Sequence, residues 1–139
     1  VAVDPLFGLE SHRTLMSNPV TTSEARDGAW GLLAGDETAA SVICDSPGLV
    51  AQRVVATVVN IGCDIAQQRI ASPEDIDKAV TLGLGYPAGP LSWGDRIGPA
   101  KVVAILDAML AITGDPRYRA SLWLKRRAAL GVSLLTSES

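Results

Sequence analysis

The spacing of apolar residues changes at Asp45-Ser46-Pro47-Gly48. Before this junction, short apolar runs alternate with turn residues, which is typical of strands. After it, apolar residues recur about every 3.6 residues and no strand pattern returns. The pattern therefore predicts strands over 1–3, 14–16 and 42–44 and a helix over 24–34, followed by a purely helical region.

The longest periodic segment covers residues 49–69. It contains many β-branched residues, but no turn residue interrupts it before Gly62, and strands rarely run so long. We therefore predict one helix of roughly 30 Å, at about 1.5 Å per residue. Two neighbouring apolar stripes follow this helix: Val50, Val54, Val58, Ile61 and Ile65 in the first, and Val55, Val59 and Cys63 in the second. We expect a helix with so wide an apolar surface to be buried on more than one side, as the central helix of the domain.

A fully specified helix start follows at residues 72–75, which read Ser-Pro-Glu-Asp. Serine is a favourable N-cap, proline fits the first helical position, and the aspartate completes the spacing of a capping box. We interpret the acidic residues here, Asp77 included, as complements to the helix dipole rather than as a metal site. Gly83 is predicted to end this helix, and the two glycines and two prolines within 84–90 predict a stiff loop.

Three more helices are predicted beyond this loop, over 90–98, 99–113 and 121–131. The tail over 132–139 carries a small apolar patch, Val132, Leu134 and Leu135, and is expected to fray after it. The cationic run Lys125-Arg126-Arg127 lies near the end of the last predicted helix. There we interpret its charge as a complement to the helix dipole rather than as an anion site.

The composition favours one domain, or one domain with a remnant of another, because the chain has 139 residues of which 47% are hydrophobic and 19% charged. A net charge of −3 argues against nucleic-acid binding.

No apolar segment is long enough for a membrane span and no signal peptide opens the chain, so we expect a cytoplasmic protein with no membrane partner. Cys44 and Cys63 show neither metal-ligand spacing nor a disulfide framework, which favours a reducing compartment. Because the chain begins at Val1 rather than Met, we expect it to be a piece of a longer protein.

The residues offer little catalytic chemistry of their own. Gly83-Leu84-Gly85 follows a helix and lacks a third glycine, so we reject it as a dinucleotide-binding turn. His12, the only histidine, is interpreted as exposed or packed in a loop rather than as a general base. Gln52 is the exception, because a polar side chain in the first turns of an apolar helix either faces a cleft or caps a half-exposed turn. Both interpretations of Gln52 stay open, and the three isolated tryptophans are interpreted as core residues: Trp30, Trp93 and Trp123.

Three ordered motifs carry a resemblance to a known family. They read DSPGLVAQR over 45–53, ASPEDIDKA over 71–79 and GLGYPAGP over 83–90, and the turn GDPRYR over 114–119 supports them. Together they closely resemble the C-terminal helical domain of 3-hydroxyacyl-CoA dehydrogenases. The resemblance covers about residues 21–130, which is most of the chain.

The resemblance implies a mainly α fold similar to the C-terminal domain of 6-phosphogluconate dehydrogenase. A helical bundle around one long central helix would occupy 47–139, preceded by a small α/β remnant or linker over 1–46. The resemblance also implies an NAD-dependent parent enzyme whose NAD and catalytic His–Glu pair belong to a separate Rossmann domain, with no match to either here. In such an enzyme the helical domain supplies the homodimer interface and one wall of the acyl-CoA cleft.

The chain departs from the family at two places. Gln52 stands where the family has an active-site asparagine, and one extra methylene can displace a catalytic hydrogen bond by more than about 1 Å. Residues 131–135 read GVSLL and lack the family's glycine-rich aromatic ending. These departures favour the second helical domain of a two-copy member, such as those of fatty-acid or phenylacetate β-oxidation, over a first, catalytic copy.

Two functional hypotheses follow from the resemblance. In the first, the chain is part of an NAD-dependent 3-hydroxyacyl-CoA dehydrogenase, inactive by itself, with Gln52 lining the substrate cleft. In the second, it is a non-catalytic helical module for dimerisation and packing.

Overall fold

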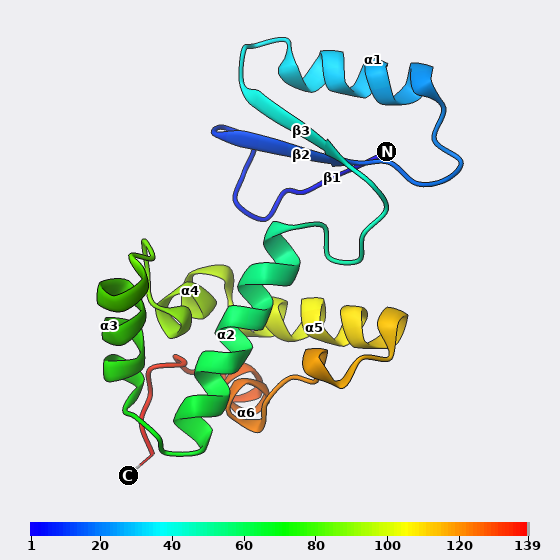
Figure 1. Ribbon diagram of the computed structural model, residues 1–139. Coiled ribbons are helices and arrows are strands. Elements are labelled where there is room, and N and C mark those ends of the chain that lie inside the picture. The colour runs from blue at the N-terminus through cyan, green and yellow to red at the C-terminus, as the bar shows by residue number, and fades with distance from the viewer. Residues whose placement is uncertain (139) are drawn as a thin grey trace. The chain divides into compact units, whose positions relative to one another are not determined.

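The computed structural model describes residues 1–138, and the chain forms two compact units. The first unit is Val1–Gln52 and the second begins at Arg53. The first contains three strands and one helix (Figure 1): β1 (Ala2–Val3), β2 (His12–Met16), α1 (Ser23–Ala34) and β3 (Ala39–Ile43). The second is helical: α2 (Ala51–Gln67, which begins in the first unit), α3 (Pro73–Leu84), α4 (Pro90–Ile97), α5 (Pro99–Thr113), the 3₁₀ turn η1 (Pro116–Tyr118) and α6 (Leu122–Leu130).

The first unit is a small three-stranded sheet in the order β1-β2-β3. β1 runs antiparallel to β2, and β2 runs parallel to β3, with α1 as the crossover between them. The predicted α/β character is therefore confirmed. Both long strands begin earlier than predicted, because the parallel pairing already starts where His12 lies opposite Ala39.

The helix α1 lies against this sheet without burying any residue. Thr22 caps it by accepting a hydrogen bond from the Ala25 N–H at 3.2 Å, a role that threonine favours. The prediction that Trp30 is a core residue is wrong, since this side chain is 47% exposed. A sheet of three strands is too small to enclose it.

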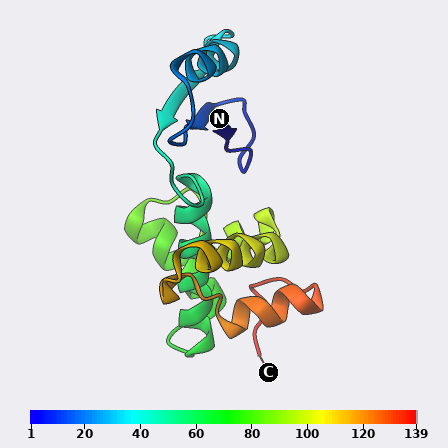
Figure 2. The same ribbon diagram turned by 90° about the vertical axis from the view of Figure 1, so that its right-hand side faces the viewer.

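The second unit is built around α2, which passes through it with the other helices arranged along its length (Figures 1 and 2). Its core joins α2, α5, α6 and the tail in one continuous cluster that includes Val59, Cys63, Leu106, Leu124 and Leu134. The predicted mainly helical fold around one long central helix is confirmed. Every helix predicted between residues 49 and 131 is present, with ends that differ by one or two residues.

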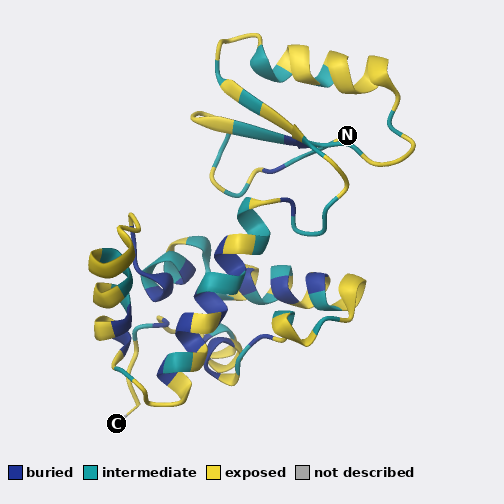
Figure 3. Cartoon of the chain, viewed as in Figure 1, coloured by how far each residue is buried: buried dark blue, intermediate teal, exposed yellow. Residues whose placement is uncertain are grey.

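The side of α2 that carries Val54 and Ile61 is exposed, as the alternation of buried and exposed segments in Figure 3 illustrates. The prediction that α2 is buried on more than one side is therefore wrong. The core lies against the second predicted stripe, with Val55, Val59 and Cys63 buried. An apolar stripe shows which surface of a helix another element can pack against. Within the second unit, other elements cover only one of the two stripes of α2.

The helix α3 begins as predicted but ends later. Ser72 accepts a hydrogen bond from the Asp75 N–H at 3.1 Å. Gly83 is part of the helix, so the prediction that it ends α3 is wrong. The chain leaves the helix at Gly85, whose φ of 67° is the left-handed conformation that glycine adopts at a helix end.

Two residues of the apolar patch predicted in the tail, Leu134 and Leu135, belong to or pack against the core of the second unit. Leu134 is fully buried, and its carbonyl oxygen accepts a hydrogen bond from the Trp123 ring N–H at 3.0 Å. Arg127 is buried as well; it lies over the Trp123 ring and donates to the Thr136 carbonyl oxygen. Arg127 therefore holds the tail in place, and it also lies in the last turn of α6, where its charge complements the helix dipole as predicted.

Candidate functional site

Gln52 lies in the first turn of α2, half-buried. Its Nε2 group donates a hydrogen bond of 2.9 Å to Oδ1 of Asp4, a residue 48 positions earlier in the chain. The first unit contains both residues. The sequence predicted that Gln52 either faces a cleft or caps its turn, and the structure shows its amide nitrogen bonded to a carboxylate.

Asp4 is placed by the backbone that follows β1. Its N–H donates to the Thr14 carbonyl oxygen at 3.1 Å, and its Oδ1 also accepts from the Leu6 N–H at 3.1 Å. The residue is only 7% exposed, and its second oxygen, Oδ2, has no hydrogen-bond partner within residues 1–138. A buried carboxylate oxygen is costly without a donor, so this position can accept a hydrogen bond from a further polar group.

Sequence reasoning missed Asp4, although Gln52 was singled out. An aspartate before a proline reads as a turn residue, and nothing local relates it to a helix that begins after residue 50. Only the folded pairing of β1 with β2 brings Asp4 to the first turn of α2.

Asp77 has a role that the sequence did not reveal either. Its carboxylate accepts hydrogen bonds from the N–H groups of Leu91 at 2.8 Å and Ser92 at 2.9 Å. These are the first N–H groups of α4, whose own N-cap, Gly89, has no side chain to do this. Asp77 therefore caps α4, which corrects our interpretation of it as a complement to the dipole of its own helix.

The loop before α4 has to contain glycine at this point. A Cβ atom on Gly89 would lie 2.1 Å from the Asp77 carboxyl carbon. The motif GYPAGP therefore fixes the turn between α3 and α4. This agrees with the stiff loop that the glycines and prolines within 84–90 predict.

The remaining candidates do not form a reactive group. His12 is exposed on β2, where its Nε2 lies 3.1 Å from the Ser41 hydroxyl, and this pair contains no carboxylate to orient the ring for base catalysis. Trp123 is buried and Trp93 is packed against the core, as predicted. Within residues 1–138, no three His, Cys, Asp or Glu side chains form a group that could hold a metal ion, and no helix is long and apolar enough to cross a membrane.

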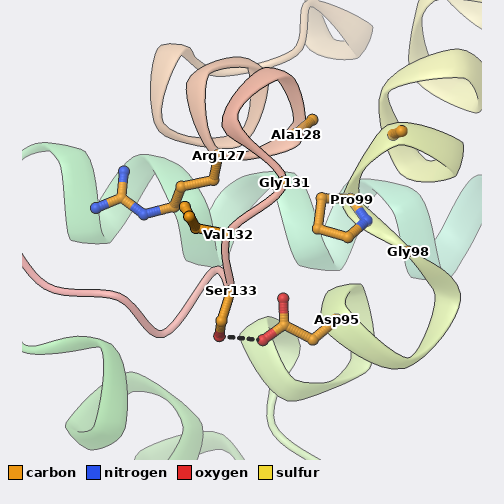
Figure 4. Close-up of a pocket in the computed structure, with 9 residues that line it drawn as sticks. Asp95, Gly98, Pro99, Arg127, Ala128, Gly131, Val132 and Ser133 are labelled. Carbon is orange, nitrogen blue, oxygen red and sulfur yellow. Dashed lines mark hydrogen bonds between the residues drawn. The ribbon is translucent and has the colours of Figure 1, made fainter.

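A pocket of about 440 Å³ lies between the start of α5 and the tail. Its polar side chains already bind one another or point elsewhere, as Figure 4 shows. Asp95 accepts from the Ser133 hydroxyl and from the Leu134 N–H, and the Arg127 guanidinium points away from the cavity toward the Trp123 ring. The side chains of this pocket therefore leave no uncommitted polar group for a ligand.

The first unit does not fit an NAD molecule. A dinucleotide needs a glycine-rich turn between a strand and the N-terminus of the next helix, where backbone N–H groups contact the pyrophosphate. The turn between β2 and α1, residues 17–22, reads SNPVTT and contains no glycine.

Comparison with known proteins identifies the family. The model of the 3-hydroxyacyl-CoA dehydrogenase C-terminal domain matches residues 48–134. The chain is 40% identical over 88 residues to a 3-hydroxyadipyl-CoA dehydrogenase of Escherichia coli, covering 63% of this chain and 18% of that protein. It is 38% identical over 78 residues to a 3-hydroxybutyryl-CoA dehydrogenase of Clostridioides difficile, covering 56% of this chain and 28% of that protein.

A solved structure extends the similarity over the first unit. The crystal structure of a 3-hydroxybutyryl-CoA dehydrogenase from Escherichia coli superposes with a TM-score of 0.82 and 33% identity, over 92% of this chain and 27% of that chain. The chain therefore spans less than a third of the length of these relatives. With the helical fold around α2 and the family match over most of its length, the chain belongs to the 3-hydroxyacyl-CoA dehydrogenase family and contains its C-terminal domain.

Proposed function

We propose that this chain is part of an NAD-dependent enzyme that oxidises the 3-hydroxyl group of an acyl-CoA to a ketone by hydride transfer. The match of residues 48–134 to the family's C-terminal domain carries this proposal. On the resemblance described above, we place this enzyme in fatty-acid or phenylacetate β-oxidation. The proposed location is the cytoplasm.

In this proposal, NAD and the catalytic base belong to a part of the enzyme outside this chain. The residues of the first unit do not fit NAD, because the turn before α1 lacks glycine. We assign two contributions to the chain itself: a dimer interface, and one wall of the acyl-CoA cleft. We place the start of the helical domain at residue 47, with 1–46 as a degenerate α/β remnant, in the second helical copy of a two-copy enzyme.

The proposed cleft residue is Gln52, at the position of the family's active-site asparagine. Its Nε2 donates to Asp4, which leaves its amide oxygen as the group that could accept a hydrogen bond from a substrate. Asp4 would then act as a positioning residue that fixes the orientation of the amide.

The same hydrogen bond favours an alternative function. The amide nitrogen of Gln52 is bound to a buried carboxylate of its own chain, which is a contact typical of packing. Glutamine is one methylene longer than the family's asparagine, and its amide reaches Asp4. In the alternative, the chain is a non-catalytic helical module for dimerisation and packing.

Assays of the full-length enzyme and of the isolated chain test the enzymatic proposal. We expect the full-length enzyme to reduce acetoacetyl-CoA with NADH and the isolated chain to be inactive. Reduction by the isolated chain at a rate near that of an enzyme would show that the catalytic groups are wrongly assigned.

Substitution of Gln52 in the full-length enzyme separates the two functions. If Gln52 lines the cleft, Gln52→Ala lowers kcat of the folded enzyme by at least about 10-fold, in addition to the loss of stability that follows from removing the donor to buried Asp4. If Gln52 only packs, catalysis by the folded enzyme is unchanged and any effect is on stability. Gln67→Ala, at the exposed end of α2, is the matched control, and it should change neither property.

A further inference from the structure

The strand β3 forms one edge of the sheet in the first unit, with β2 on its other side. The N–H of Ser17, which directly follows β2, donates to the Ile43 carbonyl oxygen at 3.1 Å, so the backbone groups of Ile43 point toward β2. Backbone groups alternate in direction along a strand, and those of Ser41 therefore point toward β2 as well. The N–H and C=O groups of Ala40 and Val42 point to the free edge.

This edge lacks the features that usually keep an edge strand from pairing with other chains. Natural edges are commonly protected by a proline, a bulge or a charged side chain. β3 reads Ala-Ala-Ser-Val-Ile, pairs with β2 in an unbroken register, and has none of these. Ser41 is exposed and Val42 is 40% exposed, and within residues 1–138 the outward backbone groups of Ala40 and Val42 have no hydrogen-bond partner. The edge can therefore pair with a further strand.

Both ends of β3 carry negative charge. Residues 1–52 contain seven acidic residues and two arginines, which gives the first unit a net charge of −5. Glu37 lies two residues before β3, and Asp45 lies two residues after it. Both are exposed, and neither makes an ion pair with another described residue. An unpaired carboxylate thus flanks the free backbone groups at each end.

We use the name β3 edge for β3 together with Glu37 and Asp45. We infer that the β3 edge binds an extended segment of a partner polypeptide that has a basic residue at each end. The segment adds a strand beside β3, with hydrogen bonds to the backbone of Ala40 and Val42. Its basic side chains lie opposite Glu37 and Asp45. This inference goes beyond the proposed function, because it requires neither the acyl-CoA reaction nor a dimer.

A second copy of the chain fits this edge poorly. Antiparallel pairing of two copies of β3 about a two-fold axis at Ser41 would bring Glu37 of each copy next to Asp45 of the other. Parallel pairing would place each carboxylate beside its own counterpart. Like charges that lie opposite each other across strands are destabilising. A segment with basic ends meets an opposite charge at each end in either direction.

Amide hydrogen exchange of the chain, measured by NMR with a synthetic peptide as the probe, tests this inference. Glu37 and Asp45 are eight residue steps apart, roughly 26 Å in an extended chain. The probe therefore has nine residues, with alternating threonine and valine between a lysine at each end. At saturation it should slow the exchange of the Ala40 and Val42 amides at least about 10-fold. The Ser41 amide already faces β2 and should change little.

Matched charge changes test the electrostatic part. The same peptide with glutamate in place of both lysines should bind at least about 10-fold more weakly. The double variant Glu37→Gln, Asp45→Asn should weaken binding of the lysine peptide about 3- to 10-fold. The control variant Glu10→Gln, Glu24→Gln removes the same charge from the first unit at other places, since Glu10 lies over Gly8 and Glu24 is in the first turn of α1. It should change the affinity less than about twofold.

The exchange of the Ser41 and Ile43 amides shows in each variant whether the sheet is intact. The inference is overturned if the lysine peptide does not bind, if it binds without slowing exchange at Ala40 and Val42, or if both peptides bind equally well. Protection of Ala40 and Val42 that grows with the concentration of the chain alone would also overturn it, because a second copy would then cover the edge.

Discussion

In the first unit, α1 buries no residue and a side chain of the sheet makes polar contacts at its C-terminal end, whereas in the second unit α2 is held by a continuous apolar core. This side chain is Arg13 on β2. It donates to the carbonyl oxygens of Leu9 and Leu33 and, through two nitrogens, to the Asp36 carboxylate at 2.6 and 2.7 Å. Polar contacts thus replace burial in the first unit.

The difference follows from size. A unit that ends at Gln52 encloses little volume, and its buried apolar side chains are Leu15 and Leu49. A segment of this size buries roughly 60% of its unfolded surface at most and is marginally stable alone. The second unit encloses leucine, valine and tryptophan side chains from several helices, so most of the stability of the chain should come from it.

The two cysteines provide the largest expected contrast, because each unit contains one. Cys44 is exposed and Cys63 is buried. Burial raises the pKa of the Cys63 thiol to about 12, and the charges of Asp95, Asp77 and Asp64 add to this effect against Arg127. The thiolate is the reactive form, so at about pH 8 we expect Cys63 to react with a thiol reagent about 10³-fold more slowly than an ordinary thiol.

Absorbance with an aromatic disulfide reagent measures these rates, and mass spectrometry assigns them. Cys44→Ser should remove the fast phase, and Cys63→Ala should remove the slow one. Similar rates for both cysteines in the folded chain would contradict a closed core in the second unit.

Glycine-to-alanine substitutions probe the packing of each unit, and their expected effects are smaller than the contrast between the two cysteines. Gly94 of α4 faces the core, where a Cβ would lie 2.4 Å from Leu134 Cδ1 and 2.7 Å from Val59 Cγ1. Gly94→Ala should therefore destabilise the second unit by about 1–3 kcal/mol. Gly28 of α1 has no heavy atom within 4 Å of such a Cβ. Gly28→Ala should stabilise α1 by about 0.5–1 kcal/mol, since alanine favours helix.

Amide hydrogen exchange measured by NMR reports on each unit separately, which a single unfolding curve would not do. Opposite signs for the two substitutions are the expected result. Destabilisation by Gly28→Ala would show that α1 is packed on that side, and a neutral Gly94→Ala would show that the contact with Leu134 is loose.

The sequence predicted the elements because their ends have local signals. The serine caps at Ser72 and Ser121 and the left-handed glycines at Gly114 and Gly131 all lie where their residue types favour them. The prediction that Gly83 ends α3 was wrong because Gly83 and Gly85 offer the same local signal for a helix end. Only the geometry of the following loop selects Gly85.

Contacts between residues distant in the sequence could not be predicted in the same way. The bond between Gln52 and Asp4 spans 48 positions, and the bond from Leu91 to Asp77 spans a loop whose shape depends on Gly89. Periodicity likewise showed that α2 is apolar on two stripes, but not that one of them stays exposed in the second unit. The candidate at Gln52 came from its position and from the family resemblance, and its partner Asp4 came only from the structure.

The contact between Arg13 and Asp36 provides the smallest effect and a direct test of how α1 is held. The Arg13 guanidinium, aided by the Thr38 N–H, holds the pKa of the Asp36 carboxyl well below its ordinary value of about 3.9. Because the folded pKa is lowered, the contact stabilises the fold above about pH 4, and its contribution is lost as the pH falls through the folded pKa. Titration of the carboxyl carbons by NMR should show that Arg13→Gln moves the Asp36 midpoint up toward the ordinary value. Asp27 is the internal control, since its pKa is lowered by Arg26 and should not change in this variant. If the Asp36 midpoint does not move, the first unit holds α1 by some means other than Arg13.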